Sequence, residues 1–84
     1  MLSAMATTDL RLEEVAEGMT QAVVTRWHAA EGDTVREGEP LLEVEADKVN
    51  VEVPAPVTGR LEQIVALVGD EVPVGGILAT IEAP

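Results

Sequence analysis

An internal repeat limits what this chain can fold into more than any other feature of its sequence. When the chain is shifted by 37 positions, residues 18–45 align with residues 55–82, and seven of the 28 aligned pairs are identical. Two copies are too few for a solenoid, which needs about three or more repeats to bury its faces. The repeat therefore predicts one small domain of two similar halves around a quasi-two-fold axis. The identical pairs are Ala29/Ala66, Gly32/Gly69, Asp33/Asp70, Val35/Val72, Gly38/Gly75, Leu41/Leu78 and Glu45/Glu82.

The residue types within the repeat favour strands. Val, Ile and Thr make up 23 of the 84 residues, and their branched Cβ atoms favour extended backbone. Seven Gly and five Pro interrupt the chain at short intervals, which is typical of tight turns. Residues 12–27 also show a helical spacing of apolar residues. The repeat aligns residues 22–29 with residues 59–66, however, and Pro54, Pro56 and Gly59 disfavour a helix there. The predicted fold class is an all-β sandwich or barrel.

Alternating apolar and polar residues predict a hairpin at the centre of the sequence. Apolar residues occupy every second position in residues 42–46 and again in residues 49–53. Antiparallel pairing must place apolar residues opposite each other, because a shift of one residue would turn the apolar face of a strand outward. This condition leaves Asp47 and Lys48 as a two-residue loop. The predicted pairs are Leu42/Val53, Val44/Val51 and Ala46/Val49.

Lys48 is the only lysine in the chain, and this register places it at the tip of the hairpin. A lysine in a turn is most often a solvated side chain without further function. A single exposed amine on a rigid hairpin also suits covalent attachment of a group by another enzyme, because the enzyme can reach it there and the ammonium can release its proton to act as the nucleophile. The chain has no cysteine, so any sulfur chemistry must come from an attached cofactor.

Charge and hydropathy exclude two classes of partner. Sixteen acidic and five basic residues give a net charge of −11, which disfavours nucleic acid and anionic membrane surfaces. No apolar run is long enough to cross a bilayer. We therefore expect no nucleic-acid partner and no membrane. Composition alone predicts a soluble, acidic, intracellular domain.

Residues 45–56 (EADKVNVEVPAP) resemble the lipoyl-attachment motif, which is usually Glu-(Thr/Ser)-Asp-Lys followed by alternating Val or Ala and a Pro. Further matches extend from about Leu10 to Glu82 and include segments 17–20, 31–35 and 69–72. Position 46 departs from the motif, since Ala46 stands where Thr or Ser is common. The chain therefore resembles the lipoyl domains of acyltransferase components in 2-oxo acid dehydrogenase complexes.

The resemblance implies a flattened β-barrel or sandwich of two four-stranded antiparallel sheets, with lipoic acid in amide linkage to Lys48. Such a domain carries groups and is not an enzyme by itself, although it forms part of a dihydrolipoyl acyltransferase. Its arm serves a thiamine-diphosphate-dependent 2-oxo acid decarboxylase, the acyltransferase catalytic domain and dihydrolipoyl dehydrogenase. A lipoate ligase or lipoyl transferase attaches the cofactor. The location that the resemblance implies is the cytoplasm of a bacterium, or the mitochondrial matrix if the chain is a processed fragment.

The resemblance also implies a set of recognition residues around Lys48. In this interpretation the modifying ligase or a partner enzyme recognises two sets of residues. One set flanks the lysine (Asp47, Glu45 and Val49), and the other lies in a loop (Gly18, Met19 and Thr20). The simpler interpretation makes Asp47 an ordinary turn residue, Glu45 part of a solvated strand face, and Met19 a core residue.

Two alternatives to the lipoyl carrier remain open at this point. A biotin carrier of a carboxylase shares the fold, but biotinyl relatives usually have Ala-Met-Lys-Met at the turn, where this chain has Asp47 and Val49 beside the lysine. An interaction module with an unmodified Lys48 is the other alternative. In either case we expect a flexible tail over residues 1–8, the domain over residues 9–83, and a linker from residue 84. The repeat further predicts that Arg11 and Ala83 meet at the end opposite Lys48.

Overall fold

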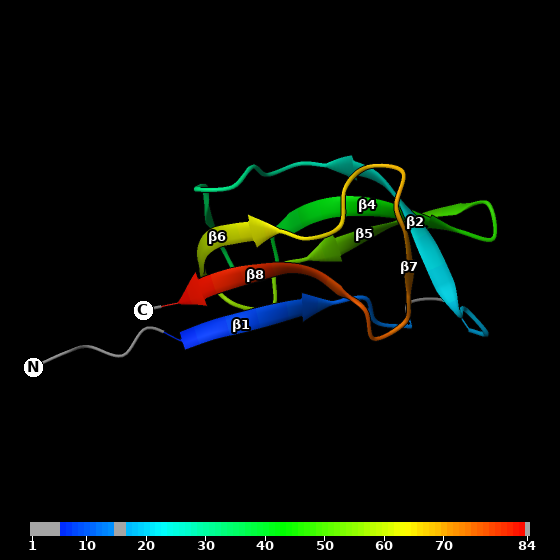
Figure 1. Ribbon diagram of the computed structural model, residues 1–84, viewed down its shortest axis with the longest axis horizontal. Helices are drawn as coiled ribbons and strands as arrows, with labels where there is room; N and C mark the ends of the chain where they lie inside the picture. The colour runs from blue at the N-terminus through cyan, green and yellow to red at the C-terminus, as the bar shows by residue number, and fades with distance from the viewer. Residues whose placement is uncertain (1–5, 15–16, 84) are drawn as a thin grey trace, which may run out of the picture.

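Eight strands form two four-stranded antiparallel sheets, as expected from the sequence (Figure 1). The computed structural model describes residues 6–14 and 17–83. One sheet has the order β1-β8-β6-β3 and the other has the order β5-β4-β2-β7. No helix long and apolar enough to span a membrane occurs in these ranges. The strands are β1 (Ala6–Arg11), β2 (Gln21–Trp27), β3 (Thr34–Val35), β4 (Pro40–Ala46), β5 (Val49–Pro54), β6 (Gly59–Ile64), β7 (Glu71–Pro73) and β8 (Ile77–Ala83).

Matching hydrogen bonds in the two halves confirm the quasi-two-fold relation. The backbone N–H of Gly32 donates to the carbonyl of Leu61 over 2.7 Å. The equivalent residue Gly69 donates to the carbonyl of Val24 over 2.8 Å. Both glycines have positive φ angles, +94° and +96°, which disfavour residues with a Cβ atom. This shared turn explains why glycine occurs at both positions of the repeat.

The aspartate that follows each glycine closes the same turn. The Asp33 carboxylate accepts a hydrogen bond from the Ala30 N–H over 2.9 Å, and the Asp70 carboxylate accepts one from the Leu67 N–H over 2.9 Å. These bonds are local side-chain-to-backbone contacts that stabilise turns. The Gly-Asp pairs are therefore turn-forming residues in both halves.

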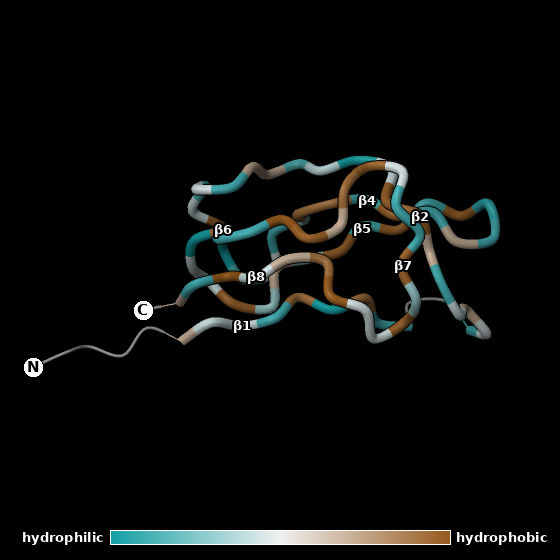
Figure 2. The backbone as a smooth tube through the Cα atoms, in the orientation of Figure 1, coloured by the Kyte–Doolittle hydropathy of each residue, from teal (hydrophilic) through white to brown (hydrophobic). Residues whose placement is uncertain are grey.

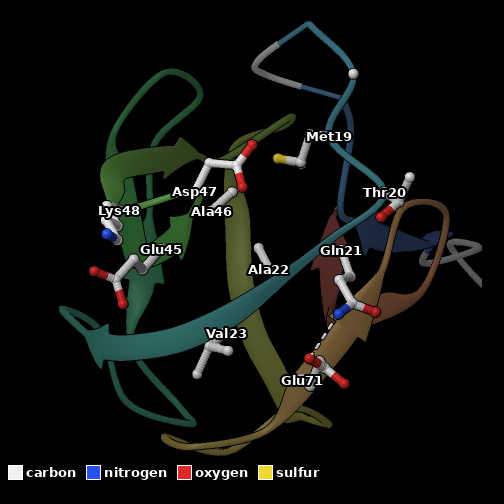
Figure 3. Close-up of a pocket in the computed structure, with 11 residues that line it drawn as sticks. Met19, Thr20, Gln21, Ala22, Val23, Glu45, Ala46, Asp47, Lys48 and Glu71 are labelled. Atoms are coloured by element: carbon white, nitrogen blue, oxygen red, sulfur yellow. Dashed lines mark hydrogen bonds between the residues drawn. The ribbon is translucent and has the colours of Figure 1, made fainter.

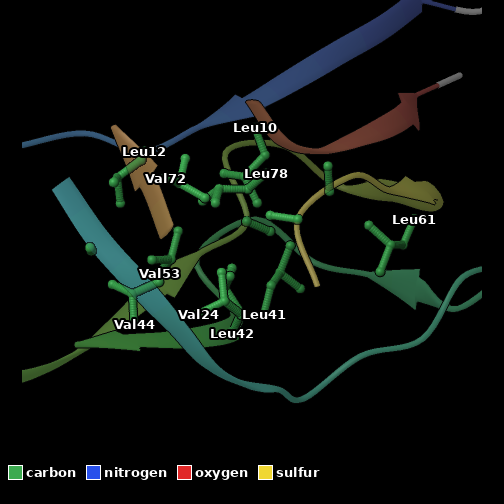
Figure 4. Packing of buried hydrophobic residues seen from close by; sticks show 14 of the residues in the cluster. Leu10, Leu12, Val24, Leu41, Leu42, Val44, Val53, Leu61, Val72 and Leu78 are labelled. Atoms are coloured by element: carbon green, nitrogen blue, oxygen red, sulfur yellow. The ribbon is translucent and has the colours of Figure 1, made fainter. Parts of the chain in front are cut away.

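The core lies between the two sheets and consists of aliphatic side chains (Figure 4). Leu41 and Leu78 occupy equivalent positions in the repeat, and both are fully buried. Burial of such side chains contributes about 1.5–3 kcal/mol each relative to exposure. The buried core residues are Leu10, Leu12, Met19, Ala22, Val24, Val35, Leu41, Leu42, Val44, Ala46, Val53, Ala55, Leu61, Ala66, Val72, Leu78, Ala79 and Ile81.

The first strand corrects two details of the sequence analysis. β1 begins at Ala6, which pairs with Ala83, so residues 6–8 of the expected tail belong to the sheet. Residues 1–5 and residue 84 lie outside the described residues. Arg11 pairs with Ile77 and does not meet Ala83, so that prediction is wrong.

Unequal loop lengths explain the error. Nine residues, 12–20, separate β1 from β2, whereas four residues, 55–58, separate β5 from β6. The constant offset of 37 positions between the two halves therefore does not hold for β1. Figure 1 shows the start of β1 and the end of β8 at one end of the molecule, and the β4–β5 hairpin at the other.

Candidate functional site

The tip of the β4–β5 hairpin has the predicted geometry. Ala46 pairs with Val49, which leaves Asp47 and Lys48 as the two-residue loop. Both loop residues have positive φ angles, +50° and +66°, as a type I′ turn requires. Aspartate tolerates this conformation better than most residues do, whereas lysine adopts it less often. The strands on either side hold the turn in this shape.

The Lys48 side chain is exposed and has no carboxylate partner in the described residues. The contacts between basic and acidic side chains in these residues are Arg11–Asp9 at 3.4 Å, His28–Glu52 at 2.8 Å and Arg60–Glu82 at 3.9 Å. An incoming enzyme would therefore not need to break a salt bridge to reach the Lys48 amine. The burial of Ala46 and Val53 anchors the two strands below the tip.

A depression of about 350 Å³ lies beside the turn and brings most of the predicted site together (Figure 3). Lys48, Asp47 and Glu45 line it from the hairpin. Val49 does not line it, and its side chain is 53 % exposed. The full lining is Gly18, Met19, Thr20, Gln21, Ala22, Val23, Glu45, Ala46, Asp47, Lys48 and Glu71.

The long β1–β2 connection supplies the opposite wall of this depression. Gly18 has a φ of +80°, and its N–H donates to the Glu14 carboxylate over 2.9 Å. The Thr20 carbonyl accepts a hydrogen bond from the Val74 N–H over 3.0 Å, which fixes the end of the loop. Met19 is 7 % exposed and belongs to the core, and Figure 3 shows its thioether directed toward the hairpin turn.

Five lining residues were not predicted as site residues from the sequence, and two of them, Gln21 and Glu71, contact each other. The Gln21 side-chain amide donates to the Glu71 carboxylate over 2.7 Å, joining β2 to β7. These residues are 50 positions apart, so no local motif signals the contact. Only the pairing of the strands brings them to the site. Val23 of β2 pairs with Glu45 of β4 on one side and with Glu71 of β7 on the other.

The charges around the depression are mainly negative. Glu45, Asp47 and Glu71 bring three carboxylates, and Lys48 is the only Lys or Arg that lines it. No group of three or more His, Cys, Asp or Glu in the described ranges is arranged to hold a metal ion. The candidate site therefore consists of one accessible primary amine at the end of a rigid hairpin, beside an acidic depression.

Two curated relatives match almost the whole chain. A dihydrolipoyllysine-residue acetyltransferase component of the pyruvate dehydrogenase complex from Corynebacterium glutamicum is 46 % identical over 76 residues, covering 90 % of this chain and 11 % of the relative. A dihydrolipoyllysine-residue succinyltransferase component of the 2-oxoglutarate dehydrogenase complex from Bartonella vinsonii subsp. berkhoffii is 46 % identical over 77 residues, covering 92 % and 19 %. The chain thus spans less than a fifth of the length of either relative.

Solved structures of two classes share the fold. The lipoyl domain of the 2-oxoglutarate dehydrogenase complex from Azotobacter vinelandii superposes with a TM-score of 0.70 at 32 % identity, covering 87 % of this chain and 92 % of that domain. The urea carboxylase of Kluyveromyces lactis superposes with a TM-score of 0.78 at 28 % identity, covering 90 % of this chain and 6 % of that protein.

One family model covers β2 to β7, most of β1 and β8, and the attachment turn. The biotin/lipoyl family, described as "Biotin-requiring enzyme", matches residues 8–81. The match spans well over half of the chain and agrees with both relatives and both superpositions. This chain belongs to the biotinyl/lipoyl-attachment domain family.

Proposed function

We propose that this chain is a lipoyl carrier domain, with lipoic acid joined by an amide bond to the Nζ of Lys48. The observation that carries the proposal is the exposed Lys48 amine at the tip of a two-residue turn, with no carboxylate partner among the residues that the structure describes. When attached, the dithiolane supplies acyl transfer and two-electron redox chemistry that a chain without cysteine lacks. The hairpin holds the arm away from the core, so a partner can enclose it.

The names of the similar proteins support lipoate over biotin. Both curated relatives at 46 % identity are dihydrolipoyllysine-residue acyltransferase components. Asp47 and Val49 flank Lys48, where biotinyl domains usually have methionine on both sides. The urea carboxylase superposition supports a biotin carrier as the second candidate, because it matches the fold at a slightly higher TM-score but at lower identity.

The proposal places the chain in a 2-oxo acid dehydrogenase complex, as one domain of a longer acyltransferase subunit. Its partners there are a thiamine-diphosphate-dependent decarboxylase, the acyltransferase catalytic domain and dihydrolipoyl dehydrogenase, after a lipoate ligase or lipoyl transferase has modified Lys48. Attachment to one arm raises the local concentration of the cofactor at each partner site. The bacterial relatives support a location in the bacterial cytoplasm.

Intact mass with peptide mapping tests this proposal directly on protein isolated from its native host. We expect a single lipoyl increment, confined to the peptide that contains Lys48. A biotin increment on that peptide would assign the chain to the carboxylases. An unmodified Lys48 in a host that lipoylates its other carrier proteins would contradict both carrier functions and leave an interaction module.

We further propose that the ligase recognises the Asp47 carboxylate, which is exposed and one residue from the acceptor amine. Asp47→Asn keeps a residue that tolerates positive φ, so the turn and the unfolding midpoint should not change. Removal of the charge should slow lipoylation of Lys48 about tenfold, the effect of losing roughly 1.4 kcal/mol of contact energy. The measurement is the initial rate of mass gain with purified ligase.

The matched control is Glu62→Gln, which removes an exposed carboxylate from β6 in the other sheet. That variant should be lipoylated at the wild-type rate. Equal rates for Asp47→Asn and the wild type would leave Asp47 as a turn residue only.

A further inference from the structure

The depression beside the Lys48 turn has a floor of buried apolar side chains. Met19, Ala22 and Ala46 line it, and they are only 7 %, 2 % and 6 % exposed. All three belong to the core, so the apolar interior of the domain reaches the surface beside the attachment residue. The volume of about 350 Å³ lies within the range of about 300–1,000 Å³ that is typical of small-molecule sites.

The carboxylates of the depression lie at its rim. Glu45, Asp47 and Glu71 are all exposed, so they can stay solvated when a group covers the floor. A neutral apolar group can therefore lie on the floor without burying a charge. A methylene chain that ends in a dithiolane ring is a group of this kind.

The wall opposite the hairpin consists of residues that the fold does not need. Nine residues link β1 to β2, whereas four residues link β5 to β6 at the equivalent place in the repeat. The shorter connection shows that two such strands can be joined without the additional residues. The longer connection supplies Gly18, Met19 and Thr20, all of which line the depression.

The corresponding end of the other half is closed by the backbone. A Cβ atom at Gly59 would collide with the Glu82 carbonyl oxygen. The repeat aligns Gly59 with Ala22 and Glu82 with Glu45, and both of these equivalents line the depression. The two halves share their turns but differ in this region, and the more open half is the one that carries the only lysine.

The depression is ordered before anything binds to it. The Thr20 carbonyl accepts a hydrogen bond from the Val74 N–H over 3.0 Å, and the Gln21 amide donates to the Glu71 carboxylate over 2.7 Å. Figure 3 shows the Met19 thioether directed toward the hairpin turn. A preformed site loses little conformational entropy on binding, and a polarizable thioether adapts its shape to an irregular group.

From these observations we propose that Met19 and the depression around it hold the lipoyl arm of Lys48 in a resting position between transfers. The inference rests on the proposed carrier function. Covalent attachment fixes the occupant, because Lys48 itself is part of the lining. The resting position shields the dithiolane from other thiols and reductants, and it lowers in the same proportion the fraction of arms that a partner enzyme can engage. Met19 is thus a positioning residue.

Methyl NMR of the lipoylated 84-residue chain tests the contact without any enzyme. Met1, Met5 and Met19 are the only methionines, and each gives one signal when its methyl group is labelled with carbon-13. We expect lipoylation to shift the Met19 signal and to produce a nuclear Overhauser effect between its methyl group and the dithiolane protons. Met1 and Met5 precede β1, which begins at the end opposite the hairpin (Figure 1), so their signals should not move. An unmoved Met19 signal without this effect would overturn the inference.

The rate of reduction by an uncharged phosphine measures how often the dithiolane is covered. The ring gains two electrons and two protons to become the dithiol, and the phosphine takes the oxygen of water to become the phosphine oxide. The reference is a lipoylated peptide of residues 45–52, which keeps the local charges but lacks the depression. We expect the domain to react about threefold more slowly than the peptide, as for a ring that is covered about two thirds of the time. Equal rates would overturn the inference.

Variants at Met19 separate an apolar contact from general damage. Met19→Gln makes the floor polar at a similar length, so its rate should rise to that of the peptide. Met19→Leu keeps apolar surface of similar volume and should stay as protected as the wild type. Leu67→Gln is the matched control at a side chain that is 62 % exposed and outside the depression, and it should not change the rate. Equal loss of protection in both Met19 variants would indicate disturbed packing and would count against the inference.

Two further readouts keep the tests independent. The NMR experiment uses the wild-type chain, so it decides the question even if Met19→Gln does not fold. Mass spectrometry of the native protein separates this inference from the proposed function. An unmodified Lys48 contradicts the carrier function, whereas a lipoylated chain that is reduced at the rate of the peptide contradicts only the resting position.

Discussion

Replacement of Lys48 by arginine should abolish lipoylation and all acyl transfer while the fold stays intact. A guanidinium remains protonated at accessible pH, so it cannot act as the acceptor nucleophile. It keeps the positive charge and replaces one exposed long side chain with another. We therefore expect a stability change within about 0.5 kcal/mol. The measurements are intact mass after incubation with ligase, turnover in the reconstituted complex, and the urea midpoint.

The single lysine makes this experiment unusually specific. Because Lys48 is the only lysine, a lipoyl increment that persists in Lys48→Arg would have to lie on another group, such as the N-terminal amine. That result would remove Lys48 from the proposed function.

A second pair of variants tests whether the position or only the amine is recognised. Lys48→Arg/Arg60→Lys and Lys48→Arg/Arg26→Lys move the lysine to exposed strand positions on β6 and β2. We expect neither to be lipoylated, because the amine then no longer extends from a turn beside Asp47. Modification of either would show that the ligase accepts any exposed lysine of this chain.

The hairpin and its lysine could be predicted from the sequence, because the alternation of apolar and polar residues allows only one register between β4 and β5. A slip of one residue would bury glutamates and expose valines along two strands, which costs far more than any gain at the turn. All three predicted pairs are present, and they place Asp47 and Lys48 at the tip. The repeat in turn predicted strands where apolar spacing alone also allowed a helix.

The pairing of the first strand and the Gln21–Glu71 contact were harder to predict. Both depend on contacts between residues that lie far apart in the sequence. The extra residues of the β1–β2 connection break the constant shift on which the prediction for Arg11 depended. That same connection buries Met19, which the sequence also allowed as an exposed recognition residue. The Gln21–Glu71 contact depends on the pairing of β2 with β7, which neither residue signals alone.

The exposure of three apolar residues on the loop between β6 and β7 could not be found from the sequence either. Val65, Leu67 and Val68 continue the apolar character of β6, so they look like core residues in a linear reading. β6 ends at Ile64, however, and the turn that follows directs these side chains to solvent.

Truncation of either of two equivalent core leucines should cause the largest loss of stability. Leu41 and Leu78 are both fully buried, and their carbonyls accept equivalent hydrogen bonds in the two halves. Leu→Ala at such sites costs about 2–5 kcal/mol, because it loses burial and leaves a cavity. A domain of this size has a total stability of only about 4–13 kcal/mol. We expect both variants to lose a large share of it, by amounts that agree within about 1.5 kcal/mol.

Urea denaturation followed by circular dichroism measures the effect. The midpoint should fall by about 2 M or more at an unchanged slope near 1 kcal/mol/M. Leu67→Ala is the matched control, since it makes the same chemical change at a side chain that is 62 % exposed, and it should shift stability by no more than about 0.5 kcal/mol. A cost below about 1 kcal/mol at Leu41 or Leu78 would contradict the packing described here. Strongly unequal costs would mean that the two halves share their backbone turns but not an equally packed core.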